Sequence, residues 1–277
     1  MEIGQYHTLK ILRITPPGAY LSYGGEEDID ILLPTKYIPE KAKVDDFIEV
    51  FVYRDSEDRI ICTTDHPHAT TNQFAFLKVN DVSSVGAFLD WGIEKDILLP
   101  FREQKTRLNR GEWCLVYILL DEKTDRVFAT TKLGKFYKNE EIELEVGEEV
   151  DLLIADETDL GVNVVINNEY RGLIYENDIF HDLLEGDKTV GYIKEVRPDN
   201  KIDVSLRKEG LENLELGARQ IMGELRSNEG FLPLHDKSSP EEIQSTLQMS
   251  KKNFKRSIGI LYKKKLITIE SEGIRKA

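Results

Sequence analysis

Histidine and cysteine are the residue types in this sequence best suited to metal or covalent chemistry, with five of the first and two of the second. His66 and His68 stand two residues apart beside Asp65, a spacing that could hold a metal on a strand. No third ligand is identifiable, and a polar linker is the competing interpretation. Cys62 and Cys114 are too few and too far apart for a disulfide framework or a CxxC metal knuckle, so we expect both to be inert core residues.

Catalytic signatures are the next place to look for an enzyme. The phosphate-loop, dinucleotide-binding, serine-hydrolase and zincin motifs do not occur in the sequence. The acidic pairs, such as Glu140-Glu141, stand beside turn residues or near an expected domain boundary, where solvated loop charge explains them. The sequence therefore predicts a protein that is not an enzyme and that uses no cofactor and no metal.

Base stacking is a different chemistry, because binding of single-stranded RNA requires a flat aromatic ring and cations along the path of the backbone. Tyr175 offers such a ring, with a half-buried strand tyrosine as the competing interpretation. We expect it to act with four cations from the same part of the chain, namely Arg171, Lys201, Arg207 and Lys208.

A run of basic residues near the carboxyl end offers a second set of phosphate contacts, and residues 250–265 contain no acidic side chain. At about 100° per residue, Phe254, Ile258 and Leu261 form an apolar stripe of a helix while four cations share another face. A solvated helix face is the competing interpretation. The candidate cations of this run are Lys251, Lys252, Lys255, Arg256, Lys263, Lys264 and Lys265.

Three aromatic residues in the first half of the chain, Tyr20, Phe88 and Trp91, are weaker candidates for RNA contacts. Acidic neighbours such as Asp90 and Asp96 would repel phosphate. The alternative is that this part of the chain is a spacer or the contact surface for a protein partner.

The distribution of charge separates the two ends of the chain. The whole chain carries a net charge of −14, which argues against nucleic-acid binding over its entire surface. Residues 211–277 hold 12 basic and 9 acidic residues, a net of +3, whereas residues 1–210 hold 25 and 42, a net of −17. A basic tip that meets nucleic acid is compatible with this asymmetry.

Internal repeats indicate how these side chains are positioned. GAYL at residue 18 and GAFL at residue 86 lie 68 residues apart, and RIICTT and RVFATT lie 67 apart. A looser third copy covers residues 150–207. Each copy has about five short strands in about 65 residues, the size of a closed Greek-key barrel of the OB type rather than a β-sandwich. We expect three tandem OB-fold repeats, at residues 1–65, 74–133 and 146–208.

Residues 211–277 read as a mixed α+β unit. We expect a connecting helix over 211–226, and Ser239-Pro240-Glu241-Glu242 is typical of a helix start. That helix should run to about Leu247, and after a short turn Ser250 should cap a second helix ending near Lys263. The last twelve residues then read as two strands. The expected fold is mainly β: three five-stranded OB barrels followed by a winged helix.

The repeats resemble a known domain. GLI at 172–174 and NKIDVSLRK at 200–208 follow the pattern of the S-one RNA-binding domain, named after the largest protein of the bacterial small ribosomal subunit. Three copies followed by a short helical tail resemble the conserved virulence factor B family, which implies a bacterial RNA-binding regulator. In such domains an aromatic on the second strand and a His after the third commonly face RNA. The first position holds Tyr20, Phe88 and Asn163 in the three copies, and the second holds Pro34, Pro100 and Tyr175.

These observations favour a sequence-tolerant single-stranded RNA-binding protein, a post-transcriptional regulator in which the third repeat and the winged helix form one basic and aromatic surface. The alternatives are a DNA-binding transcription regulator and a protein scaffold on ribosomes or RNA-decay machinery. The amino terminus lacks the features of a secretory signal, and no stretch of about 18 apolar residues occurs, so we expect a cytoplasmic protein with no membrane contact.

Overall fold

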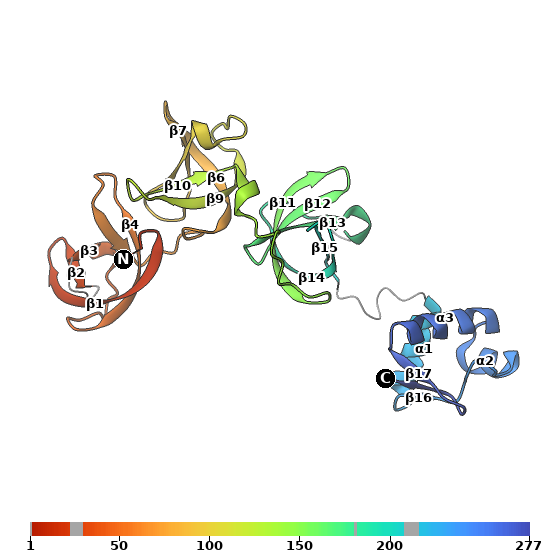
Figure 1. Cartoon of the computed structure of the whole chain (residues 1–277). Helices are drawn as coiled ribbons and strands as arrows, with labels where there is room; N and C mark the ends of the chain where they lie inside the picture. Colours follow the sequence, from red (N-terminus) through yellow and green to blue (C-terminus); the bar gives the residue numbers. More distant parts are fainter. Residues whose placement is uncertain (1, 23–29, 180–181, 208–215) are drawn as a thin grey trace.

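Three closed β-barrels and a winged helix follow one another along the chain (Figure 1). The computed structural model describes residues 2–22, 30–179, 182–207 and 216–277. Each barrel has five strands, and around its wall they pair in the order first, second, third, fifth, fourth. The predicted fold class, mainly β with a carboxyl-terminal α+β unit, is confirmed.

The strands of the three barrels correspond one to one. Barrel 1 is formed by β1 (Gln5–Thr15), β2 (Gly18–Ser22), β3 (Ile31–Pro34), β4 (Phe47–Arg54) and β5 (Ile60–Thr63). Barrel 2 is formed by β6 (Phe74–Val82), β7 (Gly86–Leu89), β8 (Ile97–Pro100), β9 (Trp113–Asp121) and β10 (Arg126–Thr130). Barrel 3 is formed by β11 (Glu149–Thr158), β12 (Gly161–Ile166), β13 (Tyr170–Tyr175), β14 (Lys188–Val196) and β15 (Ile202–Ser205). In each barrel a single 3-10 turn follows the third strand: η1 (Thr35–Tyr37), η2 (Phe101–Glu103) and η4 (Glu176–Asp178).

The repeated glycine at the start of each second strand has a steric cause. A Cβ atom at Gly18 would lie 2.1 Å from the carbonyl oxygen of Leu33, and one at Gly86 would lie 2.3 Å from that of Leu99. The second and third strands approach too closely at this point for any side chain. The glycines of GAYL and GAFL are therefore required by the closure of the barrel.

The second half of β4, residues 50–53, is buried on both faces and joins barrel 1 to barrel 2. Val50 and Val52 point into the core of barrel 1, whereas Phe51 and Tyr53 point outward into the core cluster of barrel 2. The rings of Phe51 and Trp91 meet edge to face with centroids 5.2 Å apart. Because burial of such rings is strongly favourable, barrels 1 and 2 form one packed unit.

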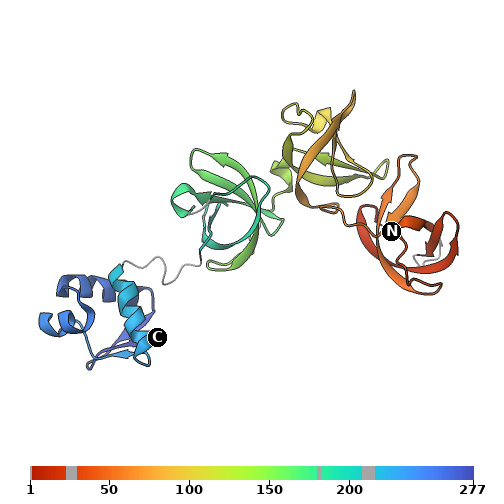
Figure 2. The same ribbon diagram turned by 180° about the vertical axis from the view of Figure 1, so that it is seen from behind.

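Barrels 2 and 3 lie next to each other (Figure 2), and a second aromatic cluster joins them. Phe74 of β6 stacks on Tyr137, with centroids 4.7 Å apart, and meets Tyr117 edge to face. Val165 of β12 is buried against this cluster. The backbone N–H of Phe74 also donates to the side-chain oxygen of Asn168, at 2.7 Å. Burial in this junction raises the pKa of Tyr137 to about 12.

The winged helix contains α1 (Leu216–Ser227), β16 (Phe231–Leu232), α2 (Pro240–Leu247), α3 (Lys251–Lys263), β17 (Ile267–Ile269) and β18 (Ile274–Lys276). Ser239 caps α2 and Ser250 caps α3, as the sequence predicts. The Glu242 side chain completes a capping box with Ser239. Residues 211–215 of the expected connecting helix lie outside the described residues. The short strand β16 was not predicted. Among the described helices, none has the length and apolar character needed to cross a membrane.

Cys62 and Cys114 are free thiols buried in barrels 1 and 2, and burial raises the pKa of each to about 12. We therefore expect neither thiol of the native protein to react with a disulfide reagent at pH 8, and both to react at once in denaturant. The absorbance of the thiolate that the reagent releases measures the rate of reaction under both conditions. A rapid reaction of one thiol in native buffer would contradict the inert role assigned to both cysteines.

Candidate nucleic-acid interface

Tyr175 is the last residue of β13 and points outward from barrel 3. Along this strand Tyr170, Gly172 and Ile174 are buried, whereas Arg171 is exposed and Tyr175 is half-buried. The alternation follows from the two-residue period of a strand. The phenol ring is thus presented on the outer wall of the barrel, where a base could stack on it.

Arg197, in the turn between β14 and β15, holds the Tyr175 ring in place. Its guanidinium carbon lies 5.7 Å from the ring centroid, and its Nη2 donates to the Tyr175 hydroxyl. Its Nε and Nη2 also donate to the buried carboxylate of Asp203, at 3.0 and 2.7 Å. The hydrogen bond to Asp203 raises the pKa of Arg197. The result is a fixed cation beside the aromatic ring.

Arg171 and Lys201 stand at neighbouring positions on the same wall, because Gly172 of β13 pairs with Ile202 of β15. Both side chains are exposed, and Lys201 makes a surface ion pair with Asp199 at 2.6 Å. Arg207 is half-buried just after the other end of β15, and Lys208 lies outside the described residues. The predicted cations therefore flank the wall at both ends of β13.

The polar residue predicted to replace an aromatic on the second strand, Asn163, is only 7% exposed. Its Nδ2 donates to a carboxylate oxygen of Asp156 at 2.9 Å. The side chain therefore makes its hydrogen bond within the wall of barrel 3 and presents no face on which a base could stack. In barrel 3 the aromatic contribution comes from Tyr175.

The basic face of α3 is exposed. Phe254, Ile258 and Leu261 pack into the core of the winged helix, as the sequence predicts. Lys251 is half-buried, and the other predicted cations are exposed: Lys252, Lys255, Arg256, Lys263, Lys264 and Lys265. We define the basic face of α3 as Lys251, Lys252, Lys255 and Arg256.

An aromatic side chain on this face was not predicted. Tyr262 is 59% exposed, and at about 100° per residue it falls at about 20°, between Lys251 and Lys255. The same helical projection that located the cations could have found it. Tyr262 therefore places a ring for stacking among cations for phosphate, within one helix.

Asn253 and Arg256 are the groups on α3 suited to reading a base edge. The Asn253 amide lies beside α1, where a Cβ atom at Gly217 would come within 3.1 Å of its Nδ2. Both residues are exposed. The remaining exposed polar groups of this helix are mainly lysines, which suit contacts with phosphate.

The weaker aromatic candidates divide into two kinds. Tyr20 is half-buried on the outer wall of barrel 1, with the Arg13 guanidinium 4.1 Å above its ring, and Phe88 is half-buried on the outer wall of barrel 2. Trp91 is only 2% exposed, and its Nε1 donates to the carbonyl of Ala69 at 2.7 Å. The interpretation of Trp91 as a possible RNA contact is therefore corrected: its ring is a packing element of the junction between barrels 1 and 2.

The two histidines of the polar segment around His66 lie near other polar side chains. His66 Nδ1 lies 3.1 Å from the Tyr6 hydroxyl, and His68 Nε2 lies 4.0 Å from Asp90. Within residues 2–22, 30–179, 182–207 and 216–277, no group of three or more histidine, cysteine or acidic side chains could hold a metal ion.

Three five-stranded barrels followed by a winged helix define a multidomain chain of the OB and winged-helix type. Residues 3–65 match the S1 domain family, and residues 219–275 match the CvfB-like winged helix domain. The chain is 27% identical over 277 residues to the uncharacterized protein YitL of Bacillus subtilis strain 168, covering 95% of this chain and 90% of that protein. It is 26% identical over 244 residues to conserved virulence factor B of Staphylococcus epidermidis strain ATCC 12228, covering 84% and 82%.

Among solved structures, the chain is similar to a multidomain protein with nucleic acid binding domains from Streptococcus pneumoniae TIGR4. That likeness covers 99% of this chain and 98% of the other, at 22% identity and a TM-score of 0.46. The resemblance to conserved virulence factor B that the sequence predicts is confirmed by the domain matches and by the relatives of that name.

Proposed function

We propose that this chain is a non-enzymatic, single-stranded RNA-binding protein that acts in the cytoplasm as a post-transcriptional regulator. The observation that carries the proposal is the basic face of α3, which the exposed ring of Tyr262 shares. The Tyr175 and Arg197 pair on barrel 3 provides a second contact of the same chemistry. The regulatory part of the proposal rests on the similarity to the conserved virulence factor B proteins.

The two contacts contribute differently to the affinity. Lysines and arginines on α3 displace counterions from the phosphates, which makes binding steeply dependent on salt and independent of sequence. The rings of Tyr175 and Tyr262 stack on bases, and every base offers a π face. Together these terms favour an unpaired strand, whose bases are free to stack, and tolerate many sequences.

Removal of the Tyr175 ring should weaken RNA binding at every salt concentration. Stacking of one base contributes roughly 1–3 kcal/mol, so Tyr175→Ala should raise the dissociation constant about 5- to 150-fold with the salt slope unchanged. Anisotropy of a labelled RNA of about 12 nucleotides provides the measurement.

Tyr175→Phe is the matched control, because it keeps the ring and removes only the hydroxyl that accepts from Arg197. It should bind within about threefold of the natural protein. Equal losses in the two variants would mean that the hydroxyl matters and the ring does not. An unchanged affinity for Tyr175→Ala would remove barrel 3 from the interface.

A further inference from the structure

A lysine and an exposed aromatic residue stand opposite each other at the same place in barrels 1 and 2. Lys10 of β1 pairs with Phe47, the first residue of β4, and Lys78 of β6 pairs with Trp113, the first residue of β9. Phe47 is 69% exposed and Trp113 is 55% exposed. Residues opposite each other on neighbouring strands have Cβ atoms about 4.5–5.5 Å apart, so each lysine stands directly beside a ring.

These pairs lie on the part of the barrel wall that is formed by the first and fourth strands. Leu77 and Val79, on either side of Lys78, are fully buried, so Lys78 lies on the outer surface of the barrel. In barrel 2, β7 and β9 flank β6 on opposite sides. Trp113 is therefore separated by a whole strand from the second-strand position that Phe88 occupies.

The ring of Trp113 has one covered face. It stacks on Phe76 of β6, with centroids 5.6 Å apart and planes 9° apart. Phe76 in turn lies against barrel 3, because a Cβ atom at Gly186 would come within 2.2 Å of its Cδ1. Since Trp113 nevertheless remains more than half exposed, the face of its ring that points away from Phe76 is open to a ligand. The stack holds the ring in place, which lowers the entropy lost on binding.

The charged groups next to Trp113 favour RNA as that ligand. Lys78 and Arg110 are exposed, and Arg110 stands in the turn that leads into β9. Glu112 of the same turn accepts hydrogen bonds from the backbone N–H and the Nδ2 of Asn109, at 2.9 Å each, so its carboxylate is engaged within the turn. A flat ring with cations beside it can bind a base together with the neighbouring phosphates.

The corresponding place in barrel 3 carries no such pair. There the same register pairs Leu153 with Lys188, the first residue of β14. Leu153 packs against the aromatic cluster that joins barrel 2 to barrel 3. This position therefore serves the contact between barrels in barrel 3, whereas in barrels 1 and 2 it presents an exposed ring.

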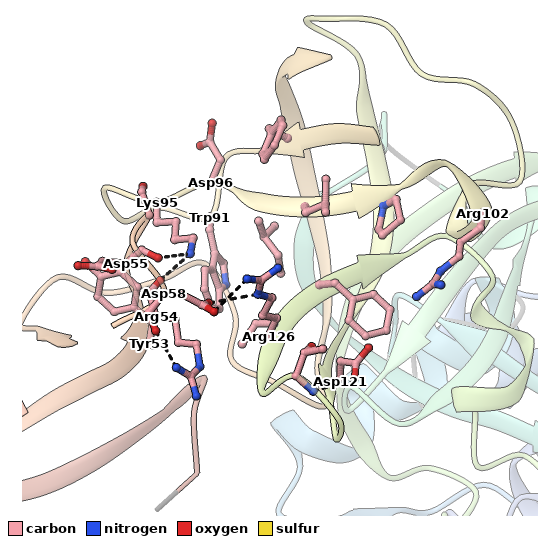
Figure 3. Close-up of a pocket in the computed structure, with 18 residues that line it drawn as sticks. Tyr53, Arg54, Asp55, Asp58, Trp91, Lys95, Asp96, Arg102, Asp121 and Arg126 are labelled. Atoms are coloured by element: carbon pink, nitrogen blue, oxygen red, sulfur yellow. Dashed lines mark hydrogen bonds and ion pairs between the residues drawn. The ribbon is translucent and has the colours of Figure 1, made fainter. Parts of the chain in front are cut away.

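The second tryptophan of the chain provides an internal reference. Trp91 is 2% exposed and lies among the residues that link the β4–β5 hairpin of barrel 1 to barrel 2 (Figure 3). In that junction Arg126 donates to both carboxylate oxygens of Asp58, at 3.1 and 2.9 Å. Because no base can stack on a buried ring, a change in tryptophan fluorescence on addition of RNA reports contact at Trp113.

We propose that the wall formed by β6 and β9 binds single-stranded RNA, with a base stacked on the open face of Trp113 and a neighbouring phosphate on Lys78. Phe47 and Lys10 form a second contact of the same kind on barrel 1, where the ion pair of Lys10 with Asp45, at 2.7 Å, competes with phosphate. This inference rests on the proposed RNA-binding function. It gives the acidic half of the chain a part in RNA binding.

Tryptophan fluorescence of the full chain, measured while an RNA of about 12 nucleotides is added, tests the proposal. We expect quenching that saturates at the same RNA concentration as the anisotropy of the labelled RNA. Trp113→Ala should abolish the quenching and raise the dissociation constant about fivefold or more, because the stacking of one base is lost. Lys78→Ala should lower the salt slope of binding by about 0.7, the value for one phosphate contact.

Trp113→Phe is the matched control, because it keeps a ring for stacking and removes the fluorescent indole. It should bind RNA within about threefold of the natural protein and show no quenching on addition of RNA. Trp91→Phe should keep the quenching, since the buried ring makes no contact with RNA.

Three kinds of result would overturn the proposal. RNA binding without quenching, or with an unchanged affinity of Trp113→Ala, would remove this wall from the interface and leave the proposed function standing. Tryptophan fluorescence that changes with protein concentration in the absence of RNA would assign the open ring to a contact between two copies of the chain. Absence of any RNA binding by the full chain would overturn this site and the proposed function together.

Discussion

Replacing Lys251, Lys252 and Lys255 together by alanine should flatten the salt dependence of RNA binding. For single strands the slope of log affinity against log salt is about 0.7 per phosphate contact, so the loss of three contacts should lower it by about two units. Because these cations line one exposed face of α3, the loss should be greatest at low salt. Anisotropy titrations of a labelled RNA at four or five salt concentrations give the slope for each protein.

The matched control removes the same amount of charge elsewhere. Lys41, Lys43 and Lys105 are exposed lysines of barrels 1 and 2 that lie outside the basic face of α3. Their triple alanine variant has the same net charge as the α3 variant. The comparison therefore separates the effect of local phosphate contacts from that of the protein's overall charge. Equal slopes for the two variants would show that net charge, and not the basic face of α3, governs binding.

Truncation of Phe51 should destabilise barrel 2, although the residue belongs to barrel 1. Its side chain is fully buried between Tyr6, Tyr53 and Trp91. Phe51→Ala should cost about 3–5 kcal/mol, since a buried phenylalanine loses both transfer free energy and packing. Both tryptophans of the chain, Trp91 and Trp113, lie in barrel 2, so fluorescence during urea unfolding reports that barrel. We expect its midpoint to fall by about 1 M or more.

Ile174→Ala is the control for this experiment, because Ile174 is fully buried in the separate core of barrel 3. It should destabilise barrel 3 and leave the tryptophan transition close to its original midpoint. A tryptophan transition unmoved by Phe51→Ala would mean that barrels 1 and 2 unfold independently. The shared cluster around Phe51 and Trp91 would then not couple the two barrels.

The architecture was predictable because its signals are local and repeated. The glycines of GAYL and GAFL recur since each second strand must approach the third too closely for a side chain. The starts of α2 and α3 at Ser239 and Ser250 could be predicted from the sequence, because capping depends on residues within one turn. These signals require no knowledge of how distant parts of the chain pack.

The outward-facing residues were harder to interpret, because neighbouring barrels decide which outer walls are covered. Trp91 reads as a candidate for stacking in the sequence, but barrel 1 places Phe51 against it. Arg197 stands in the turn between β14 and β15, and nothing in the local sequence shows that its side chain reaches Tyr175. Phe128 lies on the same wall of barrel 2 as Phe88 only through the pairing of β8 with β10, strands that are separated in the sequence.

A competition assay on the full chain separates binding of single-stranded RNA from binding of duplex DNA. A labelled single-stranded RNA of about 16 nucleotides is bound first, and unlabelled RNA or duplex DNA of the same length is then added. We predict that the RNA displaces the label and that duplex DNA requires a concentration at least about tenfold higher. Equal or better displacement by duplex DNA would contradict the account in favour of a DNA-binding regulator. Failure of the labelled RNA to bind at all would favour a protein scaffold.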